Sequence, residues 1–236
     1  MHMKKSLITL FMHLFVVIML CCAWAAAQTN RVKPAAPPVA QSSRQPALQV
    51  SPAEAGAVTG SVYRNTYFGM QLSIPRNWNV QSDATKKEIK ERGKQLIVPT
   101  TEQEKAQFEA AASRTTNLLT ISKLPIGATD QFNALFIVAA EAVPLATTNA
   151  YYMSQLKRAL QFAQVPVKFE EEGQTQTING TQFQTLTILI GPPENAARQT
   201  YYVVLRKGYA LAFITTIISE SDADVINSIV KSIKFQ

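Results

Sequence analysis

The sequence predicts an α+β fold, with a mostly antiparallel central sheet covered by helices on both faces in an α/β/α sandwich. The main observation comes from residues 200–218, where two apolar runs flank a polar turn at Lys207-Gly208. Val203 and Val204 are adjacent, so they point to opposite faces of a strand, and both faces are apolar. A strand buried on both sides belongs in the middle of a covered sheet. Amphipathic helical patterns elsewhere predict the covering layers.

The same stretch predicts the register of its hairpin. β-branched and aromatic residues dominate both runs, and Gly208 accepts the positive φ that a tight turn needs. A transmembrane hairpin is the alternative, but each run is much shorter than the roughly 20 residues of a membrane helix. With a two-residue loop, the expected facing pairs are Arg206 with Tyr209, Val204 with Leu211, and Tyr202 with Phe213.

Residues 1–27 have the pattern of a secretory signal peptide. Lys4 and Lys5 precede an apolar run over residues 7–20, and small residues follow, with Ala25 and Ala27 at the cleavage positions. We therefore expect a periplasmic or secreted protein. An uncleaved anchor helix and lipoprotein processing at one of two cysteines are the alternatives.

Removal of this segment decides which chemistries remain. It contains both cysteines, Cys21 and Cys22, and both histidines, His2 and His13. The mature chain then has no disulfide, no Ser-His-Asp or Cys-His catalysis, and no ordinary zinc or copper site. The formal net charge of +7 falls by two with the signal peptide, and charges of both signs alternate, so we do not expect nucleic-acid binding.

The rest divides into a linker and one domain. Residues 28–60 are rich in Pro, Ala, Ser and Gln without a hydrophobic period, which predicts a disordered, semi-extended tether. A proline-rich ligand for a partner is the alternative. Residues 61–236 are long enough to form one folded domain.

In chain order, the domain opens with a hairpin over residues 62–74 that we expect near a sheet edge. Trp78 then packs over the core, or alternatively stacks on a carbohydrate. Asn179-Gly180 is a strong two-residue hairpin signal, and it also begins a glycosylation sequon. Further helices are predicted over 82–96, 102–112 and 148–163, and further strands over 117–124, 134–143, 167–178 and 181–190.

The two outer helices differ in character. Residues 82–96 are highly charged, with Asp83–Lys87 and Glu88–Arg92 at i,i+4 spacing, which predicts a solvated face rather than a binding site. The C-terminal helix is amphipathic, with a capping-box-like start at Ser221 and Asp224. Its predicted apolar stripe contains Val225, Ile226, Ile229, Val230 and Ile233.

Motifs at both ends of the domain resemble a known family, the Mog1/PsbP-like α/β/α sandwich superfamily. It includes PsbP proteins of the oxygen-evolving complex, Ran-binding Mog1 proteins and bacterial DcrB-like envelope proteins, and the exported, proline-tethered form is most similar to the bacterial branch. The motifs are Tyr63-x-Asn65-x-Tyr67-Phe68-Gly69, Ile74-Pro75-x-x-Trp78, Asn179-Gly180, Tyr201-Tyr202-Val203, Gly208-Tyr209 and the final helix over residues 228–235.

The resemblance implies a non-enzymatic accessory or binding protein of the bacterial cell envelope, with no catalytic, cofactor or metal residue to carry over. Its partner is an unknown protein or small ligand, bound by one face of the sheet. The alternatives are a hydrolase that uses carboxylates without His or Cys, and a PsbP-like photosystem accessory protein. A cleft with a perturbed carboxylate would favour the hydrolase.

Two acidic clusters are candidate sites. Residues Glu170-Glu171-Glu172 fall in a strand, where alternation prevents one compact site, so we expect a solvated edge. Glu220, Asp222 and Asp224 offer oxygen ligands for Ca²⁺, although helix capping also explains them. No pair of acids is placed for glycoside hydrolysis.

We expect the mature protein to begin at Gln28. N-terminal sequencing of the exported protein checks this, because Ala27 closes the small-residue motif. An intact Met1, or a lipid on Cys21, would contradict the prediction.

Overall fold

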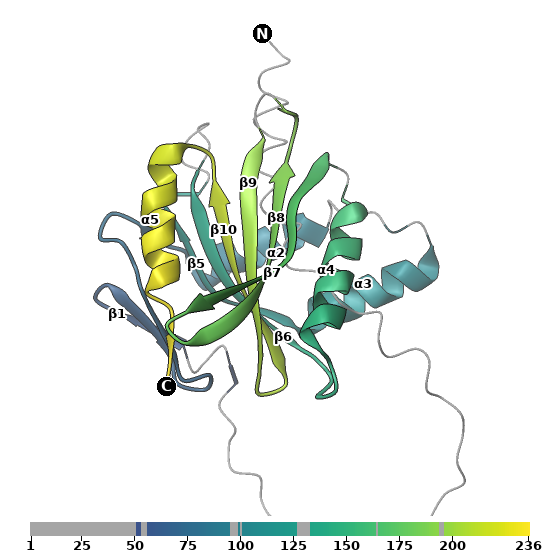
Figure 1. Ribbon diagram of the computed structural model, residues 1–236, viewed down its shortest axis with the longest axis horizontal. Helices are drawn as coiled ribbons and strands as arrows, with labels where there is room; N and C mark the ends of the chain where they lie inside the picture. The colour runs from purple at the N-terminus through teal and green to yellow at the C-terminus, as the bar shows by residue number, and fades with distance from the viewer. Residues whose placement is uncertain are drawn as a thin grey trace, which may run out of the picture.

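The computed structural model describes residues 51–52, 56–94, 99, 101–126, 133–163, 165–193 and 196–236. In this part of the chain the strands form two antiparallel sheets, and four helices accompany them (Figure 1). The α+β class and the antiparallel pairing expected from the sequence are confirmed. The predicted signal peptide and most of the predicted linker lie outside the described residues.

The larger sheet contains the predicted hairpin among its central strands. All three predicted pairs occur, Arg206 with Tyr209 among them, and Lys207 and Gly208 both have positive φ, at 52° and 76°. The seven strands are, in spatial order, β4 (Asn79–Val80), β5 (Thr115–Ser122), β6 (Leu135–Ala142), β10 (Tyr209–Ile217), β9 (Ala197–Arg206), β8 (Thr181–Ile190) and β7 (Val167–Ile178).

The smaller sheet corrects two expectations from the sequence. The opening hairpin, expected near a sheet edge, instead supplies the two inner strands of its own sheet, in the order β1 (Gly56–Thr59), β2 (Val62–Asn65), β3 (Met70–Ser73) and β11 (Lys234–Phe235). Strand β1 lies at the end of the predicted linker, so that end is a paired strand. Arg206 joins the two sheets, since its Nε donates to the carbonyl of Phe68 at 2.9 Å.

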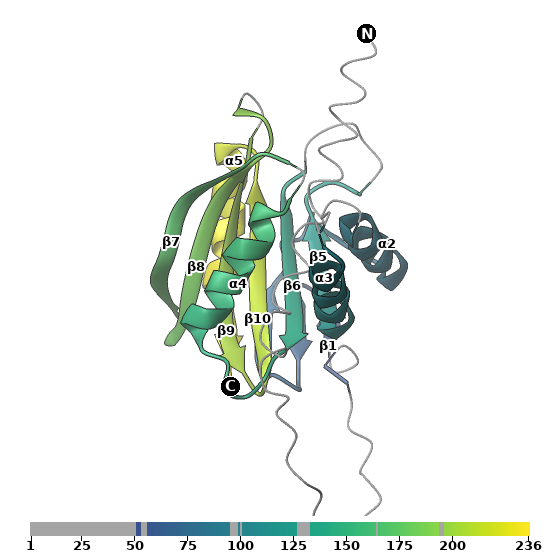
Figure 2. The same cartoon turned by 90° about the vertical axis from the view of Figure 1, so that its right-hand side faces the viewer.

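Four helices, α2 (Asp83–Lys94), α3 (Glu102–Arg114), α4 (Asn149–Gln161) and α5 (Glu220–Lys231), accompany the sheets. On one face of the larger sheet, Val203 packs with Leu156 of α4 in a core that we call the α4-side core. On the other face, Phe213 packs with Ile229 of α5 and with the smaller sheet in the α5-side core. In Figure 2, α4 crosses the near face and α5 lies behind it. None of the described helices has the length and apolar character needed to cross a membrane.

The C-terminal helix differs from its prediction at both ends. It ends at Lys231, and Lys234–Phe235, expected in the helix, pair with β3 as strand β11. Its N-cap is Ser219 rather than Ser221, so its first turn begins two residues earlier. Val225 is 36% exposed, whereas Ile226 and Val230 are buried with Ile229. Successive helical residues are about 100° apart, so a helix that turns Ile226 toward the sheet turns Val225 away from it.

Substituting Phe213 with alanine tests the two-sided core. The Phe213 side chain is fully buried, and its ring lies 5.7 Å from that of Phe183. We expect the free energy of unfolding to fall by about 3–5 kcal/mol in denaturant melts. The control, Lys87→Ala at an exposed position of α2, should change it by less than about 0.5 kcal/mol. Equal melting of Phe213→Ala and the parent would show that this core does not hold the fold.

Candidate functional site

Helices α2 and α3 stand beside the β5 edge of the larger sheet, and local interactions define their positions. Thr101 and Glu104 form a capping box at the start of α3, each side chain accepting from the other's backbone N–H at 3.1 Å. At its end the chain passes directly into β5, where the Thr115 hydroxyl donates to the carbonyl of Ala111. Ile89 is the buried residue by which α2 joins the α4-side core.

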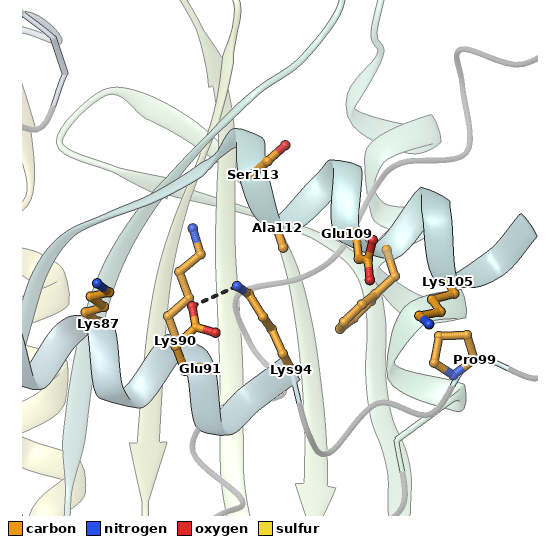
Figure 3. Close-up of a pocket in the computed structure, with 10 residues that line it drawn as sticks. Lys87, Lys90, Glu91, Lys94, Pro99, Lys105, Glu109, Ala112 and Ser113 are labelled. Atoms are coloured by element: carbon orange, nitrogen blue, oxygen red, sulfur yellow. Dashed lines mark hydrogen bonds and ion pairs between the residues drawn. The ribbon is translucent and has the colours of Figure 1, made fainter. Parts of the chain in front are cut away.

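A cavity of about 720 Å³ lies between these two helices (Figure 3). We call it the lysine cavity, because four lysines and two glutamates line it and give it a formal charge of +2. The full lining consists of Lys87, Lys90, Glu91, Lys94, Pro99, Lys105, Phe108, Glu109, Ala112 and Ser113.

Three of the lysines come from one face of α2. Lys87, Lys90 and Lys94 are spaced by three and four residues, which places their side chains on the same side of the helix. Lys105 of α3 is the fourth. Lys94 forms an ion pair with Glu91 at 2.7 Å. Within the described part of the chain, Lys87 and Lys105 form no ion pair, so their charges are available to a ligand.

Lys90 is the most deeply placed of these cations. Its Nζ donates to the carbonyl of Thr115 at 2.8 Å, which ties α2 to the end of strand β5. Burial lowers the pKa of Lys90, and the nearby charge of Lys94 lowers it further. An anion in the cavity would favour the charged form of Lys90 and so offset the cost of its burial.

The sequence located these lysines but assigned them another role. It predicted Asp83–Lys87 as an i,i+4 pair on a solvated face, whereas Asp83 pairs with Lys86 at 2.6 Å. Lys87 faces the cavity instead. The helical spacing of the lysines was the available signal, and the missing information was that α3 forms the opposite wall.

No pattern in the sequence indicated a second polar group, Glu141 of β6. It is 2% exposed, and its Oε2 accepts from the Tyr152 hydroxyl at 3.1 Å. Burial raises the pKa of Glu141 to about 8, against the smaller lowering effects of Tyr152 and Arg114. Arg114 is 3.9 Å away and partly exposed, which is too far for a hydrogen bond, so its charge does not overcome the desolvation.

The Glu141 carboxyl is therefore a perturbed group without a cleft. It does not line the lysine cavity, and its Oε1 is buried without a hydrogen-bond partner. A reactant has no access to this oxygen. The raised pKa keeps a neutral carboxylic acid inside the fold rather than presenting a general acid to a substrate.

The first predicted acidic cluster lies on β7, the edge strand of the larger sheet, as expected. The pairing of β7 with β8 is irregular near Glu170 and between Glu172 and Gln174. Arg198 lies 3.4 Å from Glu170 and 3.9 Å from Glu171, so both approach one guanidinium. Glu172 pairs with Lys157 at 2.6 Å instead.

In the second predicted cluster, the Asp222 carboxylate has partners of its own. Asp222 accepts from Lys123 and from the Ser219 hydroxyl, both at 2.7 Å, and these partners help to lower its pKa. Among the described residues, no group of three or more acidic, His or Cys side chains is placed to hold a metal ion. Asp222 therefore has a structural partner at the start of α5.

Two other candidates from the sequence also have structural roles. Trp78 is half-buried and packs against the α5-side core. The amide of Asn179, in the predicted turn, donates to the carbonyls of Lys231 and Ile233 at 2.7 and 2.8 Å. This side chain therefore fastens the β7–β8 turn to the end of α5.

The buried carboxyl predicts how stability depends on pH. The folded protein keeps a proton on Glu141 that an unfolded chain releases above about pH 4.5. The free energy of unfolding should therefore fall as the pH rises from about 4.5 to about 8, by roughly a few kcal/mol. Glu141→Gln keeps an acceptor for Tyr152 but does not titrate, so its stability should vary less in this range.

Urea melts between pH 4.5 and 9 measure this difference. The control is Glu172→Gln, which removes an exposed carboxylate. Its stability should follow the pH dependence of the parent. Parallel pH profiles for Glu141→Gln and the parent would rule out a raised pKa at Glu141.

No family model matches the chain, and no curated protein matches it significantly. Solved structures similar to it include the PsbP protein CyanoP of Synechocystis sp. PCC 6803, at 11% identity and a TM-score of 0.47, covering 76% of this chain and 95% of CyanoP. They also include LpqN of Mycobacterium tuberculosis, a protein involved in cell envelope biogenesis, at 14% identity and a TM-score of 0.38, covering 71% and 83%. The structural neighbours of this chain include a PsbP protein, a member of the family that the sequence motifs resemble.

Proposed function

We propose that the chain is an exported, non-enzymatic accessory protein of the bacterial cell envelope that binds an anionic ligand in the lysine cavity. One observation carries this proposal, namely four lysines from two helices around a concave site. Small-molecule sites are typically hollows of 300–1,000 Å³, and about 720 Å³ falls in this range.

The location of the protein is proposed from its sequence. The positive, apolar and small-residue order of residues 1–27 supports export, and the Pro- and Ala-rich residues that follow support a tether. For the domain we propose the α/β/α sandwich class. The packing of α4 and α5 in the cores on opposite faces of the larger sheet supports it.

The arrangement favours binding over catalysis. The proposal of a ligand on an open sheet face receives no support, because apolar cores occupy both faces of the larger sheet. A carboxylate hydrolase would draw on Glu141, the carboxyl with the strongly raised pKa, and this group is buried away from the cavity. Flexible lysines attract an anion as point charges without arranging it for reaction.

The double variant Lys87→Gln/Lys105→Gln tests the site. It removes one exposed positive charge from each wall and breaks no ion pair among the described residues. With pyrophosphate as the probe, calorimetric titration at low salt should show about tenfold weaker binding, because each charge contributes up to about 1 kcal/mol.

The matched control is Lys168→Gln/Lys231→Gln, which removes two exposed charges outside the cavity. It should bind pyrophosphate like the parent, and added salt should weaken binding to both. Equal loss in the two double variants would show that only net charge matters and that the cavity is not the site.

A further inference from the structure

The two walls of the lysine cavity differ in chemistry. The α2 wall consists of Lys87, Lys90, Glu91 and Lys94, and all four are charged. The α3 wall has two apolar residues, Phe108 and Ala112, in the same lining as its charged and polar members Lys105, Glu109 and Ser113. Pro99, which precedes α3, adds a third apolar surface.

Helical spacing explains this division. The α2 residues are separated by three, one and three positions, and the α3 residues repeat the same spacing, so each set occupies one face of its helix. Labelled residues of the two helices border the same cavity in Figure 3. A charged face and a partly apolar face therefore line the same open cavity.

The apolar part of the α3 wall is held by the protein core. Ala112 is buried in the α4-side core, and Phe108 packs against that core while also lining the cavity. The apolar surface is thus preformed. On the α2 wall, Lys90 and Lys94 are held by Thr115 and Glu91, and Lys87 is exposed without an ion-pair partner among the described residues. A site of this kind recognises shape on one side and charge on the other.

We propose that the ligand of the lysine cavity is an amphiphilic organic anion, which rests on the proposed function and specifies its substrate class. Its carboxylate or phosphate group lies among the four lysines of the cavity, of which Lys87 and Lys105 have no ion-pair partner among the described residues. Its apolar body lies against Phe108, Ala112 and Pro99. Lysine ammonium groups lack the planar fork of arginine, so both kinds of anionic head fit.

A simple inorganic anion would leave the apolar wall exposed to water. A ligand with an apolar body removes that surface from water, and this gain grows with the length of the body. The volume of the cavity, about 720 Å³, suits one small molecule, which favours a single amphiphile over contact with a flat membrane surface.

The test compares two carboxylates with the same head, butanoate and decanoate, by calorimetry on the full chain below the micelle concentration. Decanoate should bind at least tenfold more tightly, because its six further methylene groups reach the apolar wall. Comparing decyl phosphate with decanoate shows whether the site prefers a phosphate or a carboxylate head. Decyl maltoside, which is neutral, should bind much more weakly than either anion.

Two variants test the contributions of the ligand's anionic head and of its apolar body separately. Lys87→Gln/Lys105→Gln should weaken both carboxylates by a similar factor and leave their ratio unchanged. Phe108→Ala should reduce the ratio of decanoate to butanoate affinity severalfold, and Phe108→Leu serves if the alanine variant does not fold. Thermal melts confirm that each variant is folded.

Each outcome separates the two proposals. Equal binding of butanoate and decanoate, or tight binding of decyl maltoside, would overturn the amphiphile while leaving an anion site. A chain-length effect that Phe108→Ala and Phe108→Leu both leave intact would also overturn it. Absence of binding for pyrophosphate and both carboxylates would overturn the proposed function itself.

Discussion

The structure depends on the burial of the β9–β10 hairpin on both of its faces. Val203 lies in the core on the α4 side and Phe213 in the core on the α5 side, and neither is exposed to water. A slip of one residue would exchange every side chain between the two cores, so the register of this pair holds both in place. The tight turn at Lys207-Gly208 maintains that register, and Arg206 beside it attaches the smaller sheet.

The lysine cavity follows from the same sheet. Helix α3 runs without a loop into β5, and Ala112 and Ile89 extend the α4-side core to the two helices. The hydrogen bond from Lys90 to the carbonyl of Thr115 joins the charged wall to this strand at 2.8 Å. The site is therefore built on the edge of the sheet, and its apolar wall is part of the core packing.

Charge in the domain follows a consistent pattern. Asp222 and Glu172 have lysine partners within 2.7 Å, and Glu141 avoids charge by holding its proton. Lys87 and Lys105 have no ion-pair partner among the described residues. Their positive charge lies beside an apolar wall, which is the chemical basis for proposing an anion as the ligand of the cavity.

The sequence by itself determined the features that depend on neighbouring residues. The two-sided apolar pattern around Lys207-Gly208 specified a central hairpin and its register, because a two-residue turn leaves one way to pair the strands. Tertiary structure decided what depends on distant residues. The strand at Gly56–Thr59 forms through backbone pairing with β2, and it has no hydrophobic pattern that would predict a strand. The pKa of Glu141 is raised because the core buries its carboxyl, and the cavity exists because α3 stands opposite the lysines of α2. Local patterns carry no information about which distant surfaces will meet.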